Sequence, residues 1–503
     1  MSEALFKNEI VKEILERYRT IWSLQHAASL LHWDLEVSMP PEGVEERAIA
    51  LAELRLLERK LLLQNIAPLV DKISHKESLN DYERGVVRVL QRDIEKLKKI
   101  PEKLQYELEK TKAEATQVWR EAKKKGDFEL FRPHLEKIFS LAREVANHLG
   151  YDKHPYDPLL DIFEENLRDE TVNALFSELV PGLKKVLSKV LSSGIYPQTH
   201  ELENVKYNVD QMARANKDVL NLLGYPWSKG RLDVSAHPFS TNIGLKDVRI
   251  TTRYEGFDFK RTLFSTIHEF GHALYELQID ERLALTPLAQ GVSLGVHESQ
   301  SRFWENVIGR NRAFVKLVYP ILKSHLDFLE RYDEESLFFY FNTVRPSLIR
   351  VDADEVTYNF HIYIRYQLER MLIAGEVKVS DLPEFWNDMM EELLGVRPSN
   401  HSEGVLQDIH WSQALIGYFP TYTIGNLLSA QIKSKIEEES RRTLSDILSA
   451  GRDGIEYLKS YLKEKIHKYG STYPPDELIA KSFGESLSSK YFLKYLEDKY
   501  LTV

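Results

Sequence analysis

Apolar residues recur every three or four positions through most of this chain, and this periodicity constrains the fold more than any other feature. The first such region runs from Asn8 to about Leu191, and others follow from about residue 260 to the C terminus. The spacing predicts a succession of amphipathic α-helices. Asp247–Tyr254 differs, because it is rich in β-branched residues and alternates in polarity, which predicts a strand. We therefore expect a mainly α-helical fold with one small β-sheet.

The sequence predicts a single large domain rather than several small ones. It contains no internal repeat of fixed period and no flexible linker long enough to separate independent domains. The clearest turn cluster in the first half is Ser192–Pro197. We place a boundary there and predict one two-lobed domain over residues 1–503, with approximate lobes at 1–195 and 196–503.

Composition excludes several classes of function. Cysteine is absent, which leaves His, Asp and Glu as the strong metal ligands. A net charge of -10 argues against a nucleic-acid partner, because phosphate binding needs a basic surface. No segment approaches the roughly 20 apolar residues of a membrane-spanning helix. The polar, acidic start lacks the features of a secretion signal, so we expect a cytoplasmic protein.

The run His268-Glu269-Phe270-Gly271-His272 is the strongest chemical motif in the chain. Two histidines four residues apart lie on one face of a helix, where both imidazoles can bind one divalent metal ion. Glu269 is offset and suited to act as the general base on a water molecule. Gly271 weakens a helix relative to alanine, which predicts that another segment packs closely there. The alternative is a pair of surface histidines.

A catalytic site of this type usually has three protein ligands, so a third is expected downstream. Glu298, after a glycine-containing loop and at the start of the next helical segment, is the better candidate. His297 is the competing ligand. The alternative is that Glu298 only stabilises a helix N-terminus electrostatically. Asp247, Glu276 and Asp408 are possible hydrogen-bond partners for the metal histidines.

These residues resemble the carboxypeptidase Taq family of thermostable metallocarboxypeptidases, and the resemblance covers essentially the whole chain. Beyond the H-E-x-x-H run, five further motifs of that family occur in order. They are His237-Pro238-Phe239, Asp247-Val248-Arg249-Ile250-Thr251, His297-Glu298-Ser299-Gln300, Ile349-Arg350-Val351-Asp352-Ala353-Asp354 and Gly404-Val405-Leu406-Gln407-Asp408-Ile409-His410-Trp411.

The resemblance implies a helical fold with a deep substrate groove, similar to angiotensin-converting enzyme and neurolysin, and a homodimer. It implies release of single residues from peptide C termini with broad specificity. It also implies that His268, His272 and Glu298 hold one zinc or cobalt ion per chain and that Glu269 is the base. Nitrogen and oxygen ligands suit both ions.

An enzyme that removes C-terminal residues must bind a free carboxylate, and a planar guanidinium is the best group for that. Arg350 is the first choice, with Gln407 or His410 assisting, whereas Arg249 and Arg253 are weaker competitors. Arg350 pairing with Asp352 or Asp354 is the structural alternative.

Other polar residues are further candidates for contacts with the substrate. His410, Tyr418 and Tyr422 are, by similarity to the groove enzymes, candidates for stabilising the tetrahedral intermediate. His237 is a candidate groove residue. Either tyrosine is equally explained as a core or rim residue whose hydroxyl finds a partner.

Two other functions remain open. An oligoendopeptidase or dipeptidyl carboxypeptidase would use the same chemistry with a different cleavage position. A non-catalytic peptide-binding or structural-metal protein is disfavoured, because a structural ion normally takes four protein ligands and has no use for Glu269.

Overall fold

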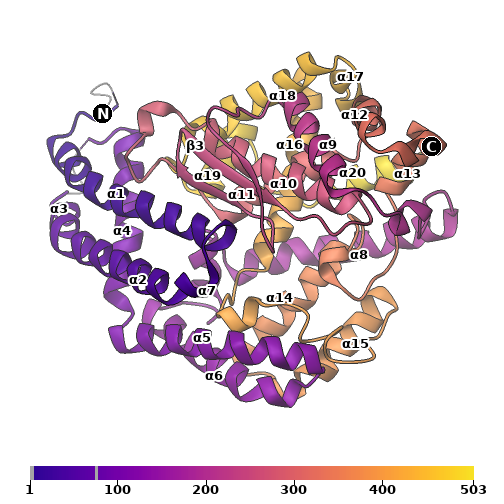
Figure 1. Ribbon diagram of the computed structural model, residues 1–503. Helices are drawn as coiled ribbons and strands as arrows, with labels where there is room; N and C mark the ends of the chain where they lie inside the picture. The colour runs from indigo at the N-terminus through magenta and orange to yellow at the C-terminus, as the bar shows by residue number, and fades with distance from the viewer. Residues whose placement is uncertain (1–4, 74–77, 503) are drawn as a thin grey trace. The chain divides into compact units, whose positions relative to one another are not determined.

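The computed structural model describes residues 5–73 and 78–502, so part of the acidic start lies outside the described residues. Those residues form twenty α-helices and three strands, which confirms the mainly helical prediction with one small sheet (Figure 1). No helix in this part of the chain combines the length and the apolar character needed to cross a membrane.

The chain folds into two compact units, and each unit is assembled from three segments that are distant in sequence. The first unit contains residues 1–97, 200–341 and 432–486, and the second contains residues 98–199, 342–431 and 487–503. The units do not coincide with the predicted lobes 1–195 and 196–503. The physical reason is that helices late in the chain pack beside helices from its first half, which the local turn at Ser192–Pro197 does not reveal.

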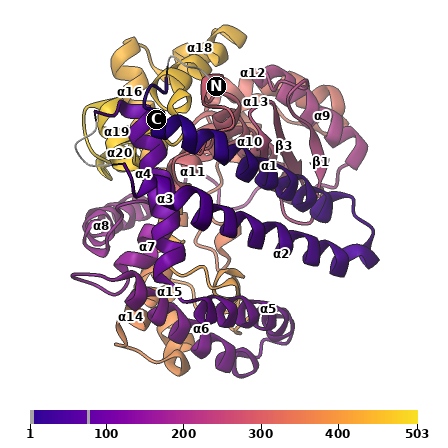
Figure 2. The ribbon, with the colours of Figure 1, turned by 90° about the vertical axis from the view of Figure 1, so that its left-hand side faces the viewer.

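The first unit combines the sheet with helices. Its core includes Val11, Ile14 and Leu15 of the first helix, packed with Val86 and Leu90. The first two helices pack side by side (Figure 2). The helices of this unit are α1 (Glu9–Val37), α2 (Val44–Leu61), α3 (Ala67–Val70), α4 (Asp81–Lys99, which extends past the boundary), α9 (Val209–Leu223), α10 (Lys260–Leu277), α11 (Leu294–Arg302), α12 (Arg312–His325), α13 (Glu334–Phe341), α17 (Leu444–Leu448), α18 (Arg452–Lys465) and α19 (Pro475–Phe483).

The sheet has the order β1-β3-β2, with β3 in the centre. Its strands are β1 (Leu232–Val234), β2 (Ser240–Gly244) and β3 (Asp247–Thr252). β1 pairs parallel and β2 antiparallel with β3. The strand predicted at Asp247–Tyr254 is therefore confirmed. β3 packs against α10, so the sheet supports the helix that carries the H-E-x-x-H run.

The second unit is helical, and α5 and α6 form its most extensive helix pair (Figure 1). Its helices are α5 (Glu102–Lys125), α6 (Phe128–Leu149), α7 (Asp157–Phe163), α8 (Asp169–Ser193), α14 (Tyr358–Ala374), α15 (Leu382–Leu394), α20 (Lys490–Tyr500) and most of α16 (Pro420–Ser440).

Candidate metal centre

The helix α10 carries the H-E-x-x-H run, and most of its residues are buried. His268 and His272 keep only 19% and 17% of their side-chain surface exposed, which argues against a pair of surface histidines. Phe264, Ile267 and Leu274 of this helix are all buried. Gly271 lies where α10 meets the backbone of α11. A Cβ atom at Gly271 would come within 2.5 Å of the Gln300 carbonyl oxygen. The close packing predicted from this glycine is thus confirmed.

That contact predicts that Gly271→Ala destabilises the protein. The added methyl group would meet backbone atoms, which cannot rotate away, so we expect a loss of about 1–3 kcal/mol despite the better helix propensity of alanine. Denaturant unfolding of both proteins would measure it. Gly43→Ala is the matched control, because a Cβ atom there meets only the Met39 side chain at ordinary distances of 3.5 and 3.6 Å. An equal effect of both substitutions would contradict the argument.

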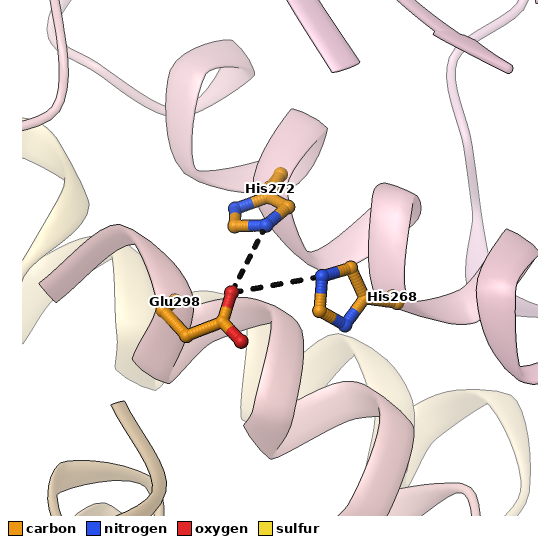
Figure 3. A group of neighbouring side chains, drawn as sticks. All are labelled: His268, His272 and Glu298. Atoms are coloured by element: carbon orange, nitrogen blue, oxygen red, sulfur yellow. Dashed lines mark ion pairs between the residues drawn. The ribbon is translucent and has the colours of Figure 1, made fainter. Parts of the chain in front are cut away.

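Three side chains from α10 and α11 converge on one point (Figure 3). Glu298 Oε2 lies 3.6 Å from His268 Nε2 and 3.4 Å from His272 Nε2. The three candidate ligand atoms all lie within 4.8 Å of one another. Among residues 5–73 and 78–502, this is the one group of three or more His, Asp or Glu side chains that could hold a metal ion. Ligands around a tetrahedral zinc ion would be about 3.4 Å apart, so this donor set fits a divalent ion. α11 is positioned by Ser293, whose hydroxyl accepts from Val296 N.

Glu305 supports His268 from behind, and the sequence reasoning missed it. Its Oε2 lies 2.8 Å from His268 Nδ1, which leaves Nε2 directed at Glu298. Arg302 connects the two carboxylates, with Nε 2.7 Å from Glu298 Oε1 and Nη1 3.3 Å from Glu305 Oε2. Glu305 lies in a π-helix, Phe303–Ile308, that continues α11. The sequence did contain an indication of this contact, because residues 298, 302 and 305 have the spacing of one helix face.

The electrostatics of the centre favour a bound cation. Burial lowers the pKa of His272 to about 3, so its imidazole is neutral, as a metal ligand must be. At His268 burial also acts downward, but Glu298 and Glu305 outweigh it and raise the pKa to about 9, so a metal ion bound there must displace a proton. The pKa of Glu298 is well below its usual range, because Arg302 and His268 outweigh burial. Burial raises the pKa of Glu269 to about 7, near the operating range of a general base.

The competing ligand His297 is not part of this group. Its Nδ1 lies 2.7 Å from His272 Nδ1, and its Nε2 lies 2.8 Å from Glu276 Oε1. Both ring nitrogens therefore face partners other than the point where Glu298 converges with the two histidines.

Arg350 lies in the second unit and is buried. Its Nε and Nη2 both donate to Asp408 Oδ1, at 3.0 and 2.8 Å, and its Nη1 donates to Tyr358 Oη at 2.9 Å. An ion pair, the structural alternative for Arg350, therefore exists, but its partner is Asp408 rather than Asp352 or Asp354. Only the fold reveals this partner, since Asp408 is 58 residues away in sequence.

The other candidates of the second unit gather near Arg350. Gln407 Oε1 accepts from the Arg350 main-chain N at 2.9 Å. His410 Nε2 lies 3.1 Å from Tyr422 Oη, and the Tyr418 ring lies 5.3 Å from that of Tyr422. Burial lowers the pKa of His410 to about 3. The sequence motifs around residues 350 and 408 thus form one polar cluster.

Three candidates lie in the first unit near the strands. His237 follows β1, and its carbonyl oxygen accepts from Ser235 Oγ at 2.6 Å. Arg249 donates to Asp247 through two hydrogen bonds, and Arg253 pairs with Glu255 at 3.3 Å. Asp247 is therefore committed to Arg249 and is not the partner of a metal histidine.

Comparison with known proteins identifies the family of this chain. The Carboxypeptidase Taq (M32) metallopeptidase family profile matches residues 13–500. The chain is 52% identical to thermostable carboxypeptidase 1 of Pyrococcus furiosus, with 99% of this chain and 100% of that protein covered. It is 39% identical to thermostable carboxypeptidase 1 of Thermus thermophilus, covering 99% and 98%.

Solved structures give the same result. A structure of Pyrococcus furiosus carboxypeptidase superposes with a TM-score of 0.97, covering 99% of this chain and 100% of the other. The M32 carboxypeptidase of Deinococcus radiodurans, 34% identical, superposes with a TM-score of 0.93 and coverage of 98% and 99%. The chain therefore belongs to the carboxypeptidase Taq (M32) family of metallopeptidases.

Proposed function

We propose that this metallocarboxypeptidase releases single residues from the C termini of peptides, with broad specificity, and that His268, His272 and Glu298 hold its divalent ion. The convergence of these three ligand atoms beside the buried Glu269 is the observation that carries the proposal. Their nitrogen and oxygen donors suit zinc or cobalt. A bound divalent ion lowers the pKa of a water molecule toward neutrality and polarises a peptide carbonyl.

Glu269 supplies the proton transfers. It sits one residue after His268 on α10, next to the ligand stripe, and its raised pKa of about 7 lets it both take and return a proton near neutral pH. In the forward reaction the Glu269 carboxylate accepts a proton from the attacking water. It then gives that proton to the nitrogen of the departing amino acid.

Arg350 is proposed to bind the substrate's terminal carboxylate. A guanidinium has five N–H groups, and the hydrogen bonds to Asp408 and Tyr358 use three of them. Among the residues that the structure describes, this leaves one N–H on Nη1 and one on Nη2. Two parallel N–H groups on the end of a guanidinium match the two oxygens of a carboxylate.

The charges around Arg350 support an anionic ligand. Asp408 pairs with both Arg350 and Arg365, at 2.8 and 2.6 Å, so one carboxylate serves two guanidinium groups. Lys123 adds a third positive charge, since its Nζ donates to the Gln407 carbonyl oxygen at 2.8 Å. A bound carboxylate would offset this excess. His410, Tyr418 and Tyr422 remain candidates for hydrogen bonds to the tetrahedral intermediate.

The product pattern from one peptide and its C-terminally amidated twin tests the proposal. We expect stepwise loss of single residues from the free-acid peptide only, abolished by dialysis against a chelator and restored by zinc or cobalt. Mass spectrometry of timed samples would show it. Internal cleavage of both peptides would instead assign an oligoendopeptidase, and release of dipeptides a dipeptidyl carboxypeptidase. No cleavage with either metal would favour a binding protein.

The homodimer, the cytoplasmic location and the resistance to heat stay predictions. The homodimer and the heat resistance follow from the resemblance to the family, and two relatives carry the name thermostable carboxypeptidase. The cytoplasmic location follows from the polar, acidic start of the sequence. Light scattering of the purified protein would give its oligomeric state.

A further inference from the structure

The two candidate metal histidines receive different support at their Nδ1 atoms. His268 contacts a carboxylate directly, with Nδ1 2.8 Å from Glu305 Oε2. His272 instead contacts another imidazole, with its Nδ1 2.7 Å from His297 Nδ1. The second nitrogen of His297 lies 2.8 Å from Glu276 Oε1. Glu276 therefore stands to His272 as Glu305 stands to His268, but it reaches His272 only through His297.

We propose that His297 is a positioning residue, which passes the hydrogen bond of Glu276 on to His272 and so fixes the tautomer and ring orientation of that ligand. The proposal rests on the metal ligands proposed above. It adds His297 and Glu276 to the residues that support the centre without binding the ion.

The hydrogen positions follow from the ligand role of His272. Its Nε2 faces Glu298 Oε2 and must carry no hydrogen if it is to bind a metal ion. A neutral imidazole has one N–H, which must then be on Nδ1. That N–H donates to His297 Nδ1, so the hydrogen of His297 lies on Nε2 and donates to Glu276. A single assignment satisfies all three residues.

Glu276 is held firmly enough to define the end of this relay. Its Oε1 also accepts from Gly291 N at 2.9 Å, and its Oε2 accepts from Asn242 Nδ2 on β2 at 2.5 Å. The carboxylate is buried and belongs to the last turn of α10. Its position is therefore set by a helix, a strand and a loop together.

Gly291 and Tyr275 both pack against the His297 ring. A Cβ atom on Gly291 would lie 2.6 Å from His297 Cδ2, so only glycine admits the imidazole there. The Tyr275 ring lies 5.0 Å from the His297 ring. The loop glycine and the aromatic neighbour thus hold the ring between its two hydrogen-bond partners.

Zinc affinity of the purified full-length protein, measured by competition with a chromophoric chelator, tests the relay. We expect His297→Phe to weaken zinc binding about 10- to 100-fold, as loss of such a supporting partner does at other metal sites. His297→Gln should lose less, because its amide can accept from His272 and donate to Glu276. The control His325→Gln removes a histidine of the same unit that bonds to Asp218, and should bind zinc normally.

Nitrogen NMR of the unsubstituted, histidine-labelled protein provides a measurement independent of any variant's stability. We expect His272 protonated on Nδ1 and His297 on Nε2. His272 protonated on Nε2, or His297→Phe with zinc affinity within twofold of the unsubstituted protein, would overturn the relay.

Two further variants distinguish failure of the relay from failure of the proposed metal ligand set. His268→Ala and Glu298→Ala should each abolish tight zinc binding. Retained tight binding in both would remove the proposed ligand set. Loss in both, together with normal binding by His297→Phe, would refute the relay alone and leave the ligand set intact.

Discussion

Glu269→Gln is expected to reduce kcat by about 10²- to 10⁴-fold while leaving the bound metal unchanged, because the amide cannot accept a proton from the attacking water. The substitution preserves the size of the side chain, and the proposed ligands His268, His272 and Glu298 are untouched. Steady-state kinetics with a free-acid peptide and atomic absorption of the dialysed protein would measure the two quantities.

The matched control is Glu281→Gln, which makes the same chemical change at an exposed glutamate paired with Lys229. It should retain normal kcat and metal content. A Glu269→Gln protein that binds metal normally and still hydrolyses peptides at the usual rate would exclude Glu269 as the base. Loss of metal together with activity would instead show that Glu269 maintains the centre.

Arg350→Gln should lower kcat/KM for free-acid peptides about 30- to 4,000-fold, which corresponds to 2–5 kcal/mol for losing one partner of a buried charged pair. Slow turnover of amidated peptides should hardly change, so the preference for a free C terminus should collapse. The fold should tolerate the substitution, because Asp408 keeps its ion pair with Arg365 at 2.6 Å. Parallel kinetics with the peptide and its amidated twin would measure the preference.

Arg370→Gln is the control for Arg350, since it removes a guanidinium from the same unit that pairs with Asp169 at 2.9 Å. It should leave the preference intact. An equal fall of kcat/KM for both peptides in Arg350→Gln would assign Arg350 a structural role rather than carboxylate binding.

Much of the fold followed from periodicity because the helices are long and amphipathic. The strand at β3 was identifiable from its β-branched residues, and Gly271 correctly indicated a close helix contact. The division into two interleaved units was not predictable in this way. It depends on which distant helices share a core, and a local turn such as Ser192–Pro197 carries no information about that.

The residues of the candidate site also fall into those that local spacing predicts and those that depend on contacts between distant segments. The spacing of the H-E-x-x-H run places two candidate ligands on one helix face, so sequence alone could propose them. The partners Glu305 and Asp408 depend on contacts between separate helical turns or separate segments. Charged residues at helical spacing are also common on solvated faces, so the alignment of Glu298, Arg302 and Glu305 was not distinctive until burial was known.

The assembly of the first unit from three separate segments has a consequence for synthesis on the ribosome. His467 Nε2 lies 2.8 Å from Oε1 of Gln300, which is two residues after Glu298, although His467 belongs to the last of these segments. At about 5–20 residues per second, roughly 10–30 s pass between the emergence of residue 305 and that of residue 467. The nascent chain thus displays the candidate ligands His268, His272 and Glu298 before the last segment of the first unit is made, so the contact between His467 and Gln300 forms only near the end of synthesis.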